Sequence, residues 1–93
     1  MQNTYLEKME EKLRELDAEI SKLSAKAKQT KEYYKNEYQK NLESLQEKQS
    51  ATRAKFNEIK QSTSSAFEDT KLGFEVAKDD LEEALREAKK NFK

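Results

Sequence analysis

The strongest constraint on the fold is a series of mostly apolar residues that alternate three and four positions apart between residues 6 and 34. The series, here called the N-terminal stripe, consists of Leu6, Met9, Leu13, Leu16, Ile20, Leu23, Ala27, Thr30 and Tyr34. This spacing places the side chains along one side of an α-helix, and its seven-residue repeat is typical of coiled coils. Because a disordered chain would not keep this register, we do not attribute the 41% content of charged residues to disorder.

The following residues also favour helix. With one Gly and no Pro among 93 residues, the chain lacks the regularly spaced turn residues of a β-sandwich or barrel. Ala, Glu, Lys, Gln and Leu dominate up to residue 60, and all are good helix formers. After a shift of register, the apolar spacing continues through Tyr38, Leu45, Phe56 and Ile59. We therefore expect an all-α fold with one long helix from about residue 4 to about residue 60, starting at a possible capping box of Thr4 and Glu7.

A turn is expected at residues 61–65, which read Gln-Ser-Thr-Ser-Ser. Serine and threonine favour helix caps over helix interiors, and Ser65 with Glu68 forms a second possible capping box. A shorter helix from about residue 66 to about residue 92 would then fold back on the first, giving a helical hairpin and a single domain over residues 1–93. The alternative left open is a solvated serine patch within one unbroken helix.

The expected lengths leave half of the first helix uncovered. At 1.5 Å per residue the two helices measure roughly 85 Å and 40 Å, so the shorter one covers only part of the longer one. The N-terminal stripe would then lie in water, which soluble monomers avoid. We therefore expect self-association through Leu6, Met9, Leu13, Leu16, Ile20, Leu23, Ala27, Tyr34, Tyr38, Leu45, Phe56, Ile59, Phe67, Phe74, Leu81, Leu85 and Phe92.

The distribution of charge favours an antiparallel homodimer. Residues 1–21 hold three cations and six anions, residues 22–60 hold ten and five, and residues 61–93 hold six and eight. Two long helices laid antiparallel would place each acidic N-terminal segment against the partner's basic segment, with a two-fold axis near Tyr33 and Tyr34. A closed two-fold is also the commonest symmetry of homo-oligomers. A tetramer and a parallel coiled coil remain open.

The residue types argue against catalysis. The chain contains no His and no Cys, so it lacks an imidazole base, a thiolate nucleophile and the usual zinc ligands. The densest carboxylate cluster, Asp79-Asp80-Leu81-Glu82-Glu83, fans out around its helix and does not converge on one ion without a second element. No Gly-rich loop is present to hold a phosphate. We expect no enzymatic activity, no cofactor and no metal.

Two other kinds of partner fit the sequence less well than self-association. Nineteen cations balance nineteen anions, whereas nucleic-acid binders usually carry a basic surplus, so we expect no nucleic-acid partner. In residues 22–40 six lysines are interleaved with three tyrosines, but Tyr34 and Tyr38 continue the apolar stripe, which favours packing. On the second helix the lysines lie on one flank of the stripe only, which is atypical of a lipid-surface helix.

The beginning of the chain contains no basic segment followed by an apolar run, so we expect no secretory signal. No segment approaches the ~20 apolar residues that span a bilayer. The expected location is therefore the cytoplasm.

Four segments carry a resemblance to known proteins. They are Tyr5-Leu6-Glu7-Lys8-Met9, Ala18-Glu19-Ile20 with Leu23, Ala66-Phe67-Glu68-Asp69 with Lys71, Gly73 and Phe74, and Ala77 with Asp79-Asp80-Leu81. Together they resemble a family of short bacterial coiled-coil proteins with apolipoprotein-like helical repeats, to which no activity is assigned. Phe67 stands where the family pattern has Trp, and Tyr33 and Tyr34 stand at alanine-like positions. The resemblance implies an α-helical coiled coil and transfers no active site.

The sequence thus predicts a non-enzymatic scaffold module that self-associates or binds another coiled-coil protein. The alternative is an apolipoprotein-like protein that opens its hairpin and binds lipid surfaces reversibly through amphipathic helices.

Overall fold

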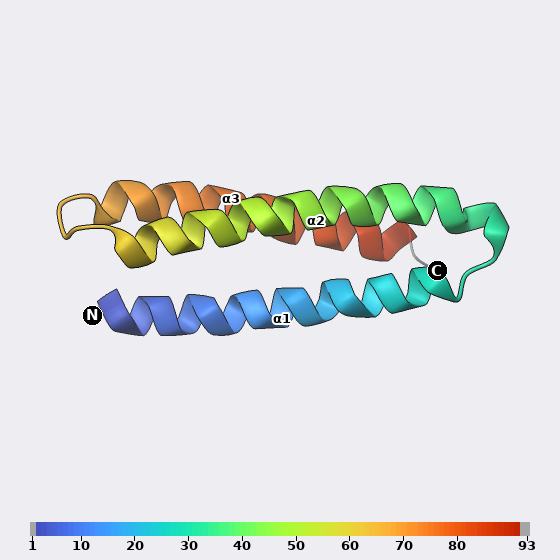
Figure 1. The fold of residues 1–93 in the computed structure, drawn as a ribbon, viewed down its shortest axis with the longest axis horizontal. Coiled ribbons are helices and arrows are strands. Elements are labelled where there is room, and N and C mark those ends of the chain that lie inside the picture. Colours follow the sequence, from blue (N-terminus) through green and yellow to red (C-terminus); the bar gives the residue numbers. More distant parts are fainter. Residues whose placement is uncertain (1, 92–93) are drawn as a thin grey trace.

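The computed structural model describes residues 2–91, without the side chains of Gln2, Asn3 and Tyr33. Within that range the chain forms three helices, α1 (Gln2–Lys28), α2 (Glu32–Gln61) and α3 (Phe67–Asn91). Successive helices run antiparallel and form a rod of 51 × 18 × 18 Å, with one interhelical turn at each end (Figure 1). The described fold is all-α and elongated.

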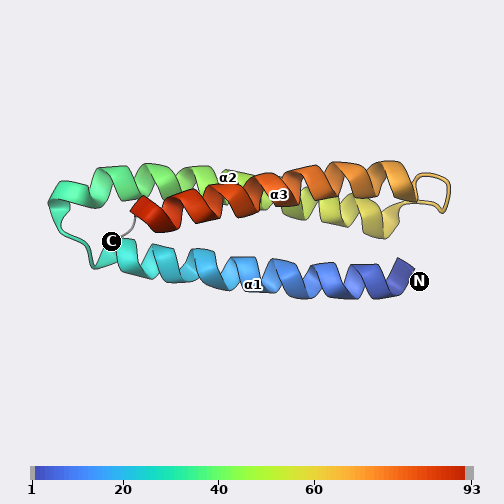
Figure 2. The same ribbon diagram turned by 180° about the vertical axis from the view of Figure 1, so that it is seen from behind.

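The core runs along the axis of the rod. α2 and α3 pack most extensively against each other, and α1 runs alongside this pair (Figures 1 and 2). The most deeply buried side chains are Phe56, Phe74, Leu45, Ile59, Leu81 and Thr52. The Thr52 hydroxyl donates a hydrogen bond to the Lys48 carbonyl at 2.7 Å and lies 3.2 Å from the Ala77 carbonyl on α3. Because this hydroxyl is hydrogen-bonded, a polar residue is tolerated between two helices.

The prediction of one helix from about residue 4 to about residue 60 is wrong, because the chain reverses direction at residues 29–31. The N–H groups of Gln29 and Thr30 donate to the carbonyls of Lys26 and Ala27, at 3.2 and 3.3 Å. Lys31 then adopts an extended conformation, with φ −66° and ψ 149°. The reversal gives up a few helical hydrogen bonds and lets the chain bury its own N-terminal stripe.

The N-terminal stripe is therefore covered within one chain. Leu13, Leu16, Ile20 and Leu23 on α1 each keep 7% or less of their surface exposed. The expectation that this stripe lies bare unless a second chain covers it is wrong. Burying each such side chain contributes roughly 1.5–3 kcal/mol, which together exceeds the cost of interrupting a helix for three residues.

The second turn, residues 62–66, overlaps the serine-rich segment 61–65. Ser62 ends α2, since its backbone N–H and its hydroxyl both donate to the Ile59 carbonyl, at 3.1 and 2.8 Å. α3 begins with Glu68 and Asp69 in its first turn, where the helix dipole favours carboxylates. The sequence places the end of this helix near Phe92, which lies outside the described residues.

Two leucines on α3 test this core. Leu81 is 0% exposed, whereas Leu72 is 66% exposed. We expect Leu81→Ala to lower the free energy of unfolding by about 2–5 kcal/mol, because it leaves a cavity where the helices meet. The matched change Leu72→Ala should alter it by less than ~0.5 kcal/mol. Urea unfolding followed by circular dichroism measures both values, and equal losses would contradict this core.

Candidate interaction site

The residues predicted to form a self-association surface lie mostly inside the bundle. The structure buries Leu13, Leu16, Ile20, Leu23, Ala27, Tyr38, Leu45, Phe56, Ile59, Phe67, Phe74, Leu81 and Leu85. Leu6 and Met9 are partly buried against this core, and Phe92 lies outside the described residues. Tyr34 remains 46% exposed at the surface. Most of the predicted surface is thus core within one chain.

The core also contains three residues that the self-association prediction leaves out, namely Leu42, Thr52 and Ala88. Leu42 follows Tyr38 by four residues and precedes Leu45 by three. The same three-four spacing therefore identifies Leu42 once the register shift is taken into account. Thr52 and Ala88 also fit the spacing, but a threonine and an alanine do not stand out by hydropathy.

Polar contacts between α1 and α2 mark their antiparallel register. Asp17 accepts hydrogen bonds from Arg53 Nη2 at 2.9 Å and from the Gln49 side chain. Nearer the second turn, a Glu10 carboxylate oxygen lies 3.9 Å from Lys60 Nζ. For each pair, the residue number halfway between the two partners falls within the first helical turn of α2. The α1–α2 contacts are thus symmetric about that turn.

Tyr5, near the beginning of α1, contacts several residues of α3. Its ring lies edge-on to Phe67 and Phe74, with centroids 6.1 and 6.5 Å apart. Lys71 Nζ lies 4.6 Å from the ring centroid, and the Tyr5 hydroxyl donates a hydrogen bond to Glu75. Burial, and then the hydrogen bond and charge of Glu75, raise the pKa of the Tyr5 hydroxyl. The hydroxyl therefore stays protonated and keeps donating to Glu75 above the pH at which a free tyrosine ionises.

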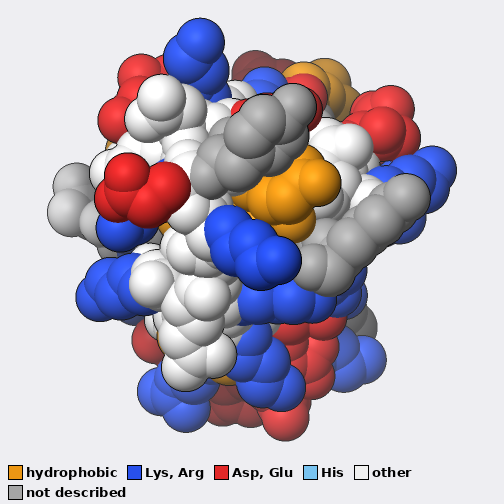
Figure 3. Space-filling model, turned by 90° about the vertical axis from the view of Figure 1, so that its right-hand side faces the viewer, with side chains coloured by type: hydrophobic (Ala, Val, Ile, Leu, Met, Phe, Trp, Pro, Cys, Tyr) orange, Lys and Arg blue, Asp and Glu red, His pale blue; other side chains and the backbone are white. Residues whose placement is uncertain are grey.

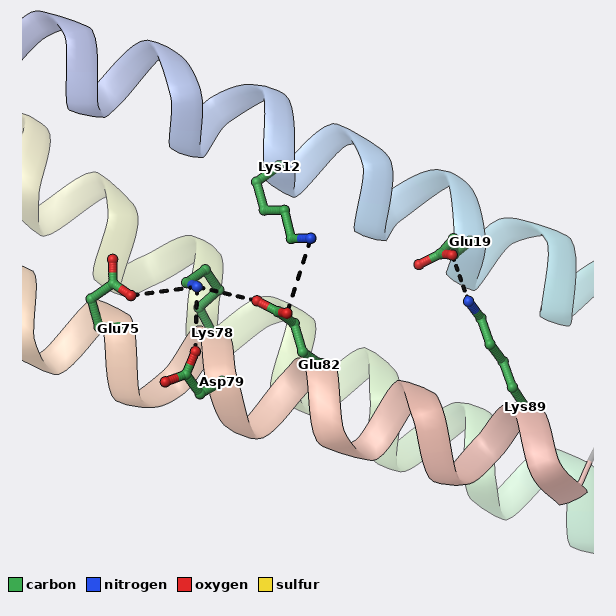
Figure 4. Close-up of polar contacts among 7 residues, drawn as sticks. All are labelled: Lys12, Glu19, Glu75, Lys78, Asp79, Glu82 and Lys89. Carbon is green, nitrogen blue, oxygen red and sulfur yellow. Dashed lines mark hydrogen bonds and ion pairs between the residues drawn. The ribbon is translucent and has the colours of Figure 1, made fainter.

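Lys78 lies at the centre of a carboxylate cluster on α3 (Figure 4). Its Nζ is 3.2 Å from Glu82, 3.3 Å from Asp79 and 3.4 Å from Glu75, and its side chain is 13% exposed. Burial lowers the pKa of Lys78, but the hydrogen bonds to Glu82 and Asp79 outweigh it and the pKa is raised. Much of the acidic cluster noted in the sequence thus pairs with a lysine of its own helix.

Other ion pairs join α3 to neighbouring helices. Lys89 pairs with Glu19 on α1, as Figure 4 also shows. Asp80 pairs with Lys48 on α2 at 2.6 Å. Such exposed pairs contribute about 0.2–1 kcal/mol each, so they orient the helices more than they stabilise them.

The end of the rod at the α1–α2 turn is rich in lysine. Lys28, Lys31 and Lys35 are exposed there, and Figure 3 shows cationic side chains beside a small apolar patch at this end, with acidic side chains nearer the edge of the view. The rings of Tyr34 and Tyr38 stack at the same end, with centroids 6.1 Å apart and an interplanar angle of 20°. This surface, called the cationic end, is defined by Lys28, Lys31, Lys35, Lys90 and Tyr34.

Leu72 and Val76 form a second exposed apolar feature, on the outer side of α3. They are 66% and 63% exposed and lie four residues apart. Isolated apolar pairs of this size are ordinary on protein surfaces, so this pair does not define a contact site.

Comparison with protein-family models, with curated proteins and with solved structures finds no match. The likeness to bacterial coiled-coil proteins stays a prediction. Among residues 2–91, no three His, Cys, Asp or Glu side chains come together as a possible metal site. No described helix is long and apolar enough to cross a bilayer. The described residues thus show two distinct features, an α1–α2 interface whose polar pairs are centred on the first turn of α2, and the cationic end.

The raised pKa of Tyr5 predicts weaker folding at high pH. In the unfolded chain a tyrosine ionises near pH 10, whereas Tyr5 in the bundle ionises at higher pH. From about pH 10 upward the unfolded chain has lost a proton that the folded chain keeps, so the free energy of unfolding falls as pH rises.

Because Tyr5→Phe removes this proton, we expect the free energy of unfolding of the variant to fall less than that of the wild type between ~pH 9 and ~pH 12. Urea unfolding across that range checks the difference. Tyr34→Phe leaves the Tyr5 hydroxyl and its hydrogen bond to Glu75 in place and is the control, so its free energy of unfolding should still fall across this range. A Tyr5→Phe curve parallel to the wild-type curve would contradict the role of Tyr5.

Proposed function

We propose that the chain is a non-enzymatic assembly module that forms an antiparallel homodimer by exchanging α1. In the dimer the interhelical turn at residues 29–31 straightens, and residues 2–61 form one long helix. α1 of each chain then packs on α2 and α3 of the other chain. The observation that carries the proposal is the symmetry of the α1–α2 contacts about the first turn of α2, where Tyr34 is exposed. Exchange of this kind is a low-cost route to a dimer, because it reuses existing contacts.

The sequence of the first turn is compatible with a continuous helix. Residues 29–31 are Gln, Thr and Lys, and no described residue has a positive φ. Lys31 already has a helical φ of −66° and departs from the helix through its ψ of 149°. Its side chain makes no capping hydrogen bond to α2. Straightening the turn therefore breaks neither a side-chain cap nor a glycine-dependent conformation.

The register of α1 on α2 is compatible with two-fold symmetry. The pairs Asp17–Arg53 and Glu10–Lys60 are both centred on position 35. When two long helices pack antiparallel in this register, each contact within a chain acquires an identical counterpart between chains, and the axis passes beside Tyr34. Tyr34 would then pack against its copy, which accounts for an aromatic residue at an exposed position of the stripe.

The balance between the two forms depends on concentration. Exchange keeps the N-terminal stripe buried, so the gain is limited to the extra helical residues and the burial of Tyr34. The opposing cost is the lost freedom of one chain, which is about 4–15 kcal/mol. In the dimer, the lysines of residues 22–40 of the two chains also approach each other at the axis. Their electrostatic repulsion opposes association, and salt screens it. We therefore expect the closed single chain at low concentration and more dimer as chain and salt concentrations rise.

The substitution Lys31→Pro distinguishes the closed single-chain bundle from the exchanged dimer. The proline ring fixes φ near −65°, the value that Lys31 has in the closed bundle. In a straight helix the same ring removes a hydrogen-bond donor and clashes with the preceding turn, which costs about 3 kcal/mol or more per chain. We expect Lys31→Pro to fold as a closed bundle and to lose the dimer, measured by sedimentation equilibrium up to ~100 μM, where mass action favours association.

Lys31→Ala is the matched control, because it removes the same lysine and favours helix. It should dimerise at least as well as the wild type. A wild-type chain that stays monomeric across the whole range would refute the homodimer. A Lys31→Pro chain that dimerises like the wild type would refute exchange and leave another mode of self-association.

Tyr34→Lys tests the axis itself. In the exchanged dimer it places two further cations together at an already basic position, so we expect dimer affinity to fall by about tenfold or more. In the closed bundle the same change removes the stacking of Tyr34 on Tyr38, so we expect the free energy of unfolding to fall by only about 0.5–1.5 kcal/mol. Leu72→Lys, which adds one cation on the outer side of α3, is the control and should dimerise like the wild type. Equal losses in both variants would place the interface elsewhere.

A further inference from the structure

The positive charge of the chain is concentrated at one end of the rod. Residues 22–40 hold six cations and two anions, and residues 86–91 hold three cations and one anion. Both segments lie toward the end that carries the α1–α2 turn (Figures 1 and 3). Because the whole chain has no formal net charge, this end carries a surplus of six positive charges and the remainder an equal negative surplus. The closed bundle is therefore electrically polar along its long axis.

Three of the four lysines of the cationic end differ in their pairing from most lysines along the rod, and the fourth, Lys90, pairs with Glu87. Along the rod, Lys48, Lys60 and Lys78 all pair with carboxylates. Among the described residues, Lys28, Lys31 and Lys35 form no ion pair. Lys28 lies in the last turn of α1, where a cation is favourable, but Lys31 and Lys35 lie at the beginning of α2, where the helix dipole disfavours cations. A stabilising effect on α2 therefore does not account for lysine at these two positions.

The shape of this end fits a flat anionic surface. Its cations come from α1, the turn, α2 and α3, so they surround a blunt end of a rod about 18 Å across. A planar array of headgroups first meets the turn and the beginning of α2, and the end of α3 lies farther back along the rod (Figure 1). Tyr34 lies among the cations with 46% of its surface exposed, and tyrosine favours the headgroup level of membranes. Nucleic acid fits less well, because Arg86 is the sole arginine of the two basic segments and lysine lacks the bidentate geometry of arginine.

We propose that the cationic end docks the closed bundle end-on to membranes rich in anionic phospholipid. The contact is electrostatic and reversible, and it keeps α1, α2 and α3 packed together. It differs from the lipid binding expected of apolipoprotein-like helices, which expose their apolar faces by opening the bundle. The proposal does not depend on the homodimer, because the closed single chain already presents the complete cationic end.

Co-sedimentation of the full chain with lipid vesicles tests the proposal. We expect binding to vesicles of phosphatidylcholine containing about 30% phosphatidylserine, none to pure phosphatidylcholine, and a steep loss of binding between ~0.05 and ~0.3 M salt, because salt screens surface charge. Each lysine near such a surface accounts for about a fivefold change in partition coefficient. The triple variant Lys28→Gln/Lys35→Gln/Lys90→Gln should therefore lose about a hundredfold.

The matched control is Lys8→Gln/Lys55→Gln/Lys60→Gln, which removes the same charge elsewhere on the rod and should change partitioning by less than about twofold. Circular dichroism verifies that both variants are folded. Absence of binding to anionic vesicles, or equal losses in the two variants, would overturn the proposal. Loss of amide protection at Leu16 and Leu81 on vesicle binding would also overturn it, since the bundle would have opened. Duplex DNA that binds as strongly at equal phosphate concentration would assign the end to nucleic acid instead.

Discussion

The bundle depends on covering the leucine-rich side of α1. Leu13, Leu16, Ile20 and Leu23 are buried only because α1 lies along both other helices. Covering them within one chain costs a reversal at residues 29–31 but no freedom of a second molecule. The rest of the arrangement follows from this choice, since α2 must then run antiparallel to α1. α3 completes the bundle by closing over Phe56 and Thr52, which are 0% exposed.

The sequence was sufficient for the all-α class and for most of the core, because both follow from local spacing. The three-four repeat identifies the buried side of α1 and of α3, and the same spacing reaches Leu42 after the register shift. The first turn was not predictable in this way. Residues 29–31 contain no Gly or Pro, and the stripe continues across them from Ala27 to Tyr34. The reversal is favoured by the tertiary contacts it allows, and local preference alone would continue the helix.

The polar contacts likewise could not be predicted from the local spacing of residues in the sequence. Lys78 lies on the flank of the α3 stripe in sequence, but its burial and its three carboxylate neighbours follow from the packing of the bundle. The link between Tyr5 and Glu75 joins residues 70 positions apart, and nothing in either segment indicates it. Both proposed contact regions depend on such long-range placement. The charge distribution already predicts a centre of symmetry near Tyr34, but the residue pairs between α1 and α2 and the gathering of lysines at one end become visible only once the chain has reversed.

The two proposals draw on the same segment in opposite ways. In the closed bundle residues 22–40 form a blunt end that a flat anionic surface can meet. In the exchanged dimer the corresponding segments of two chains lie side by side at the middle of a longer rod, where their lysines repel each other and no end is available. A ligand that binds one form better than another shifts the equilibrium toward that form. An anionic membrane would therefore withdraw chains from the dimer, whereas high salt would weaken the membrane contact and relieve the repulsion at the axis. Ionic strength would then select between a membrane-bound single chain and a dimer through one set of lysines.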